Sequence, residues 1–208
     1  MTSLLSLEVS PRGERSISRA LGTRFIEHWR EAHPGGSVVH RDLMAAPIPY
    51  MNNDWIAGVY APPDVPRTAE MNAALGLSAE LIAELTAADH VLISTPMYNF
   101  SVPAVLKSWL DYVVRPGFTF ALAPGWPGML ENKRTRLIVA TRDVYTPGTP
   151  SEADDLVSPV LRRVFAFMGI TDFETVLAGG SLGVNRGVVK LEDHLARFED
   201  AIASAARG

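Results

Sequence analysis

The sequence contains no cysteine among its 208 residues. This absence excludes a disulfide framework, a thiolate zinc site, an iron–sulfur cluster and a cysteine nucleophile. Long hydrophobic runs are also missing, because no apolar stretch approaches the roughly 20 residues that a membrane span needs. Positive charge is not in excess either, since the formal net charge is −4. A surface that follows nucleic-acid phosphates usually carries a basic excess, so we expect no nucleic-acid partner and no membrane association.

The N-terminus lacks an early Lys/Arg region and a small-residue cleavage site, so we expect no secretory signal. Together with the absence of cysteine, this favours a cytoplasmic protein. The length predicts a single domain over residues 1–208. Hydrophobic residues make up 47% of the chain and charged residues 20%, which is typical of a soluble protein with a substantial core.

Apolar, strand-like segments alternate with helical patterns along the whole chain. Strands are expected over residues 3–9, 37–43, 89–95, 135–141 and 173–178. Helices are expected from residue 16 to a stop at 33–36 and over residues 68–87, 103–114, 150–169 and 188–206. The segment 45–67 is too long for a plain connection, so we expect it to contain a short helix or a functional loop. Strands separated by helical crossovers predict an α/β fold, an open, parallel, five-stranded sheet with helices on both faces.

Open parallel sheets bind ligands beyond the carboxyl ends of their strands, so we expect function in the loops after the first, third and fourth strands. The first loop contains Ser10, Arg12, Arg15, Ser16, Ser18 and Arg19 and runs into the start of a helix. Unpaired N–H groups at such a helix end suit a phosphate. The loop has neither a Walker A motif nor G-x-G-x-x-G, so a dinucleotide pyrophosphate is not indicated. Its hydroxyls suit one terminal phosphate, as in a flavin mononucleotide. The alternative is that Ser16 only caps the helix.

The loops after the third and fourth strands hold the other candidates, which are Met97, Tyr98, Asn99 and Phe100 in one and Thr141, Arg142 and Asp143 in the other. A flat aromatic ligand could lie against the first group, with Asn99 and backbone N–H groups at its polar edge. The alternative is a turn whose aromatic side chains cap the core. The second group either approaches the same ligand or forms a solvated loop.

One block of residues resembles a known family, the FMN-dependent NADH:quinone oxidoreductases and azoreductases. The block is Met97-Tyr98-Asn99-Phe100, followed by Pro103, Leu106-Lys107, Leu110-Asp111 and Gly117-Phe118-Thr119-Phe120. The serine spacing of the first loop, Arg41-Asp42-Leu43 and Gly169-Ile170-Thr171-Asp172 are similar as well. The resemblance covers essentially the whole chain, and the Met-Tyr-Asn-Phe block is its most specific part.

This resemblance implies a flavodoxin-like fold and a homodimer with one non-covalent FMN per subunit near the interface. It also implies two-electron, ping-pong hydride transfer from NADH or NADPH to a quinone, and often to an azo compound. The flavin carries the hydride, so no side chain is needed as a nucleophile, and we expect no metal site. The phosphate is assigned to Ser10, Ser16, Ser18 and the backbone of Ile17, and the ring to Met97, Tyr98, Asn99 and Phe100, with Thr141, Arg142 and Asp143 at its far edge. The acceptor pocket is assigned to residues 50–60, Phe120, Trp126 and Phe165, and the alternative is that these residues take part in ordinary core or dimer packing.

The sequence departs from the family pattern after the fourth strand. Relatives usually carry Ser-Arg-Gly-Gly, whereas this chain has Thr141-Arg142-Asp143-Val144. If Asp143 faces the ring, its negative charge opposes the reduced, anionic flavin. Two other interpretations stay open, a flavodoxin-like electron carrier and a flavin-fold binding module without catalysis. The mild net charge and the extra length at residues 45–67 and 116–130 favour the enzyme over the carrier.

Overall fold

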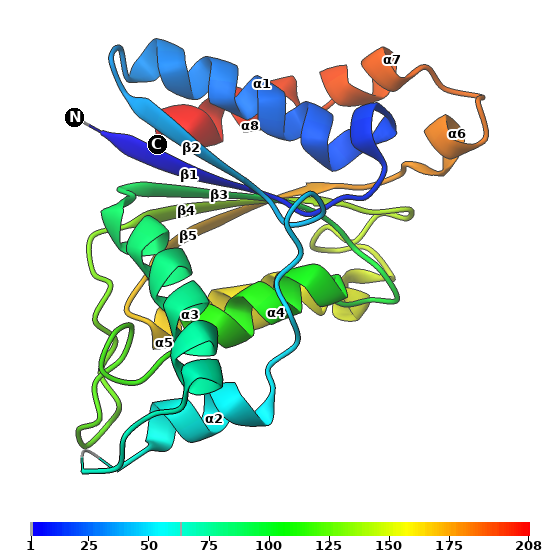
Figure 1. The fold of residues 1–208 in the computed structure, drawn as a ribbon. Helices are drawn as coiled ribbons and strands as arrows, with labels where there is room; N and C mark the ends of the chain where they lie inside the picture. The colour runs from blue at the N-terminus through cyan, green and yellow to red at the C-terminus, as the bar shows by residue number, and fades with distance from the viewer. Residues whose placement is uncertain (1, 63) are drawn as a thin grey trace.

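Five parallel strands form one sheet in the order β2-β1-β3-β4-β5 in a computed structural model, which describes residues 2–62 and 64–208 (Figure 1). The strands are β1 (Ser3–Glu8), β2 (Ser37–Asp42), β3 (His90–Pro96), β4 (Arg134–Ala140) and β5 (Asp172–Ala178). The order reverses direction between β1 and β3, and the loops that follow these two strands flank this switch point. The expected α/β fold with a parallel five-stranded sheet is confirmed.

Helices cover both faces of the sheet (Figure 1). One face carries α1 (Ile17–Ala32), α7 (Leu191–Ala196) and α8 (Glu199–Arg207), and the other carries α3 (Ala69–Ala87), α4 (Ala104–Val113) and α5 (Val157–Phe167). Helix α2 (Asn53–Tyr60) packs against α3, and the short α6 (Leu182–Asn185) follows β5. Single turns of 3₁₀ helix, η1 (Gly13–Arg15) and η2 (Glu152–Asp154), precede α1 and α5.

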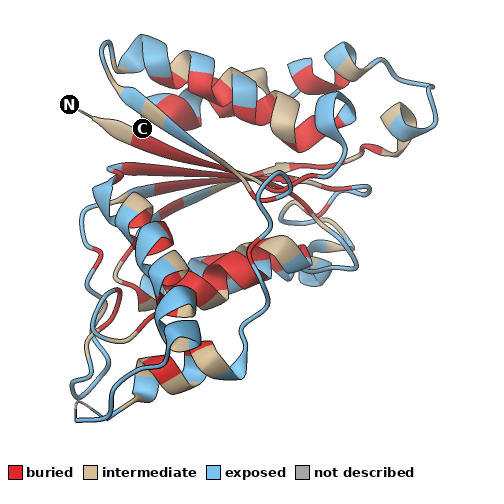
Figure 2. Ribbon diagram, viewed as in Figure 1, coloured by how far each residue is buried: buried red, intermediate tan, exposed pale blue. Residues whose placement is uncertain are grey.

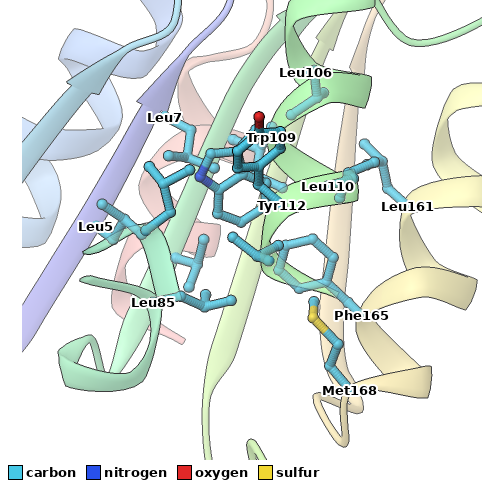
Figure 3. Packing of buried hydrophobic residues seen from close by; sticks show 14 of the residues in the cluster. Leu5, Leu7, Leu85, Leu106, Trp109, Leu110, Tyr112, Leu161, Phe165 and Met168 are labelled. Carbon is cyan, nitrogen blue, oxygen red and sulfur yellow. The ribbon is translucent and has the colours of Figure 1, made fainter. Parts of the chain in front are cut away.

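The core consists of two apolar layers, one on each face of the sheet. Figure 3 shows the layer beneath α3, α4 and α5, where Trp109 and Phe165 stack with ring centroids 6.3 Å apart. In the other layer Leu21, Phe25 and Trp29 recur every four residues, which places them on the buried face of α1. Because both faces are covered, β3 is buried along its whole length, as the apolar run at residues 91–93 predicts (Figure 2).

Two helices differ from their expected extents. The helix expected over residues 150–169 begins only at Val157, because Oδ1 of Asp155 accepts hydrogen bonds from the N–H groups of Val157 and Ser158 at 3.0 Å each and caps it there. The segment 188–206 is not one helix. The N–H of Phe198 bonds to the carbonyl of Leu195, three residues back, which ends α7 in a tight turn before α8 begins.

The two outer strands of the sheet carry ion pairs. Arg41 of β2 pairs with Glu84 and, at 2.7 Å, with Glu80 of α3. Asp172 of β5 accepts a hydrogen bond from Arg136 of β4 at 2.8 Å. In the part of the chain that the structure describes, none of the helices has the length and apolarity that crossing a bilayer requires.

Candidate functional site

Two adjoining hollows lie where the loops leave the carboxyl ends of the strands. The serine hollow, of about 210 Å³, is lined by Ser10, Arg12, Ser16, Ile17, Ser18, Pro96, Met97, Tyr98, Ala140, Arg142, Ser181 and Asn185. The aromatic hollow, of about 450 Å³, is lined by Met97, Tyr98, Asn99, Phe100, Arg142, Asp143 and Tyr145. Met97, Tyr98 and Arg142 line both. The structure thus brings together ten of the eleven candidate residues, with Thr141 the exception.

The serine hollow is built by the start of α1. Ser10, Ser16 and Ser18 are buried, and the hydroxyl oxygens of Ser16 and Ser18 lie 3.2 Å apart. Ser16 also caps α1, because its Oγ accepts from the N–H of Arg19 at 3.3 Å. Among the described residues, the N–H groups of Ile17 and Ser18 find no hydrogen-bond acceptor. Ser16 can therefore cap the helix while the first-turn N–H groups and the hydroxyls that line the hollow remain suited to an anion.

The three arginines of the first loop have different environments. Arg19 pairs with Glu8 and, at 2.8 Å, with Asp42, and its Nε donates to the carbonyl of Ser10 at 2.8 Å. The hydrogen bond from Arg19 holds the pKa of Asp42 below its usual value. Arg15 lines neither hollow. Only Arg12 reaches the serine hollow, so it is the one cation of this loop placed to meet an anion there.

The loop after β3 forms a tight, strained turn. The N–H groups of Tyr98 and Ser101 each donate to the carbonyl of the other at 3.1 Å. Between them Asn99 (φ 50°) and Phe100 (φ 66°) are both left-handed. Asn tolerates this region, whereas Phe rarely occupies it. The turn projects the rings of Tyr98 and Phe100 from the sheet edge, where 41% and 51% of these residues remain exposed. Strain of this kind clusters at binding sites.

The loop after β4 is held by its own hydrogen bonds. The hydroxyl of Thr141 donates to the carbonyl of Asp143 at 2.7 Å, and this carbonyl also accepts from the N–H of Gly180 at 3.2 Å. The buried Thr141 side chain therefore supports the loop and lines neither hollow. Arg142 and Asp143 do line the aromatic hollow, with Nε and Oδ2 3.9 Å apart.

Sequence reasoning missed several residues that line the hollows. Tyr145 lines the aromatic hollow, and burial, with a smaller contribution from the charge of Asp143, raises the pKa of its phenol. Ser181 and Asn185 reach the serine hollow from the segment after β5. Strand β5 also ends at the carboxyl edge of the sheet, so ligand-binding residues are expected in the segment after it as well.

The aromatic candidates for an acceptor pocket do not line either hollow. Phe165 is fully buried beside Trp109, so the packing alternative is correct for this residue. Phe120 packs on Phe167 with centroids 4.8 Å apart. Within residues 50–60, Trp55 is buried, whereas Tyr50 and Tyr60 are exposed.

A further hollow, of about 510 Å³, lies at the opposite edge of the sheet and is lined by Thr2, Asp89, His90, Asn132 and Arg134. Nδ1 of His90 accepts a hydrogen bond from Nε1 of Trp29 at 3.2 Å. Burial lowers the pKa of His90 to about 4, so its ring is neutral at pH 7 and plays a structural part. Despite its larger volume, this hollow has no aromatic side chain except the His90 ring and lies away from the loops that follow the strands.

The serine and aromatic hollows together fit a phosphorylated flat molecule. The serine hollow offers three buried hydroxyls, two N–H groups and the guanidinium of Arg12, which are the donors that a phosphate needs. The aromatic hollow continues from it through Met97, Tyr98 and Arg142 and has the apolar and polar lining that suits a ring system. These residues therefore fit FMN.

Comparisons with known proteins agree with this geometry. A family profile described as flavodoxin-like fold matches residues 2–202. FMN-dependent NADH:quinone oxidoreductase 2 of Trichormus variabilis is 41% identical over 207 residues, which cover 99% of this chain and 98% of that protein. FMN-dependent NADH:quinone oxidoreductase of Acidobacterium capsulatum is 46% identical over 182 residues, 87% of each chain. The crystal structure of an azoreductase from Bacillus anthracis has a TM-score of 0.87 and 28% identity, with coverage of 100% of this chain and 99% of that one. The chain therefore belongs to the flavodoxin-like family that includes the FMN-dependent NADH:quinone oxidoreductases.

Proposed function

We propose that this protein binds FMN and acts as an NADH:quinone oxidoreductase, with azo compounds as further acceptors. The observation that supports the proposal is the continuity of the two hollows, through which a serine-lined cradle adjoins an aromatic-lined space at one edge of the sheet. Relatives at 41% and 46% identity carry the quinone oxidoreductase name, and a structural neighbour is an azoreductase.

The phosphate of FMN is assigned to the serine hollow. The hydroxyls of Ser10, Ser16 and Ser18 and the N–H groups of Ile17 and Ser18 donate hydrogen bonds to it. Because these groups are fixed by the start of α1, they bind the phosphate without rearrangement. The positive end of the α1 dipole adds to the attraction.

The ring system is assigned to the aromatic hollow. When bound, FMN accepts a hydride from a nicotinamide and passes it to the acceptor. Met97, Asn99 and Arg142 orient the ring from the sheet edge, and the exposed rings of Tyr98 and Phe100 flank the open side of the hollow. One open side serves both co-substrates in turn, which supports a ping-pong order and accounts for the lack of a dinucleotide fingerprint. Tyr145 also lines this hollow, and burial raises the pKa of its phenol.

We also propose a cytoplasmic, single-domain protein that works as a homodimer, as the family resemblance implies. A groove of about 310 Å³ between α4 and α5 is lined in part by the apolar side chains of Leu110, Val114, Val160 and Phe167, of which Val160 is exposed. We assign this groove to the second copy. Val160 is 41% exposed, so Val160→Asp is expected to leave the fold intact and shift the protein toward monomer in sedimentation velocity. A wild-type protein that sediments as a monomer at micromolar concentration contradicts the dimer.

Steady-state oxidation of NADH by the FMN-loaded protein tests the catalytic proposal. With a naphthoquinone as acceptor, we expect turnover and parallel lines in double-reciprocal plots at varied acceptor concentration. Bound FMN that NADH does not reduce indicates the electron-carrier alternative. A protein that stays colourless after incubation with FMN indicates a binding module without catalysis.

A further inference from the structure

A side-chain hydrogen bond joins the loop after β1 to α6 across the serine hollow. Nη1 of Arg12 donates to Oδ1 of Asn185 at 2.7 Å, across a sequence separation of 173 residues. Arg12 belongs to the loop after β1 and Asn185 to α6, after β5. Both residues are exposed and both line the hollow, so the bond lies on its solvent side.

The charge of Arg12 is not neutralised by this contact. Within residues 2–62 and 64–208, Arg12 forms no ion pair, in contrast to Arg19, which is held by Glu8 and Asp42. The Asn185 amide oxygen accepts one N–H of the guanidinium and contributes no negative charge. A guanidinium has five N–H donors in a fixed, planar arrangement. Arg12 therefore keeps its full charge and most of its donors for an anion in the hollow.

The acceptor that orients Arg12 is itself anchored. The N–H of Asn185 donates to the carbonyl of Ser181 at 3.0 Å, and the N–H of Ser181 donates to the carbonyl of Thr141 at 3.1 Å. These bonds connect α6 to the loop after β4, which lines the same hollow. The left-handed Gly180 (φ 83°) turns the chain so that this connection is made.

We propose that Arg12 is a binding residue for the phosphomonoester group of the flavin and that Asn185 is the residue that positions it. The inference rests on the proposed function and adds a specificity to it. A neutral Asn holds the guanidinium in place without competing for its charge, whereas a carboxylate there would compete with the phosphate. Arg12 thus selects a flavin that carries a phosphate over one that does not.

Titration of the apoprotein with FMN and with riboflavin, followed by flavin fluorescence, tests this inference. Arg12→Gln is expected to weaken FMN binding about 10-fold or more, as the loss of a charge-assisted hydrogen bond implies, and to leave riboflavin binding unchanged. The matched control is Arg15→Gln, on the same loop but outside both hollows, which should bind both ligands as the wild type does.

Variants of Asn185 test the positioning role. Asn185→Asp should weaken FMN binding at least as much as Arg12→Gln, because the new carboxylate pairs with Arg12 and repels the phosphate. Asn185→Ala should give a smaller loss of a few-fold, again for FMN only. Far-UV circular dichroism checks that each variant is folded.

Equal losses of FMN and riboflavin affinity in Arg12→Gln, or no loss of either, overturn the assignment of Arg12. Wild-type FMN affinity in Asn185→Asp overturns the role of Asn185. A wild-type apoprotein that binds no flavin overturns the proposed function and this inference together, whereas FMN binding that Arg12→Gln does not alter overturns the inference alone.

Discussion

Substitutions of Asn99 can separate the shape of the turn after β3 from the chemistry of its side chain. Asn99 has φ 50° and is exposed, so its substitution removes little core packing. A left-handed conformation costs most L-residues about 1–2 kcal/mol, but Gly none and Asn less than others. Asn99→Gly therefore keeps the turn and loses the amide, whereas Asn99→Leu loses the amide and adds strain.

The two variants should differ in stability by about 1 kcal/mol, which corresponds to a midpoint lower by about 2–4 °C for the Leu variant in a chain of this size. Both should remain folded at 25 °C. If the amide donates to or accepts from the flavin, both should lose about 0.5–1.5 kcal/mol of FMN binding, or roughly 2- to 12-fold in affinity. Because the Gly variant keeps the backbone, its loss of affinity reports the side chain alone.

Thermal unfolding of the apoprotein and fluorescence titration with FMN measure the two effects independently. Wild-type FMN affinity in Asn99→Gly refutes the role of the amide. Equal unfolding midpoints for the Gly and Leu variants refute the strain argument, since the left-handed backbone would then cost nothing.

Three further predictions concern the redox properties and the stability of the protein. Asp143→Asn removes a half-exposed negative charge from the aromatic hollow, and in this solvated position the charge is worth about 1 kcal/mol at most. The two-electron potential of bound FMN should therefore rise by about 20 mV in a dye-equilibration titration. A fall in this potential contradicts the placement of Asp143 near the ring. Gly128→Ala should destabilise the fold by about 3 kcal/mol or more in urea unfolding, because its Cβ would overlap the backbone nitrogen of Gly169. Gly76→Ala, at an exposed position of α3 with open space around its Cβ, should stabilise the fold by about 0.5–1 kcal/mol. A hydrogen bond to Glu199 raises the pKa of His28 above its unfolded value. This pair should therefore contribute about 0.5 kcal/mol to the free energy of unfolding below pH 6.5, a contribution that is lost as the pH rises through the folded pKa. His28→Gln should flatten that decline in urea unfolding, and an unchanged pH profile argues against the pair.

The sheet could be predicted well because the central strands contain short apolar runs with clear boundaries. The strand expected over residues 89–95 is β3 (His90–Pro96), and the one expected over residues 135–141 is β4 (Arg134–Ala140). The break between α7 and α8 could not be predicted. It occurs at Arg197 and Phe198, where neither Gly nor Pro marks a helix end, and it depends on packing against α1.

Much of the candidate site could be located from the sequence, because a parallel sheet brings the ends of its strands to one edge. The contents of each loop could not be assigned as well. The inward placement of Tyr145 and the supporting role of Thr141 depend on hydrogen bonds and burial that the sequence does not specify. The contact between Arg12 and Asn185 joins two loops that only the folded chain brings together.

The ion pairs on the outer strands have a consequence for how copies of this protein can associate. An outer strand exposes unpaired backbone groups that can template another chain, and charged side chains discourage such edge-to-edge pairing. Arg41 on β2 and Asp172 on β5 place charge at both margins. The sheet is therefore protected from continuing into a neighbouring molecule, which guards against cross-β aggregation and restricts association to the helical surfaces.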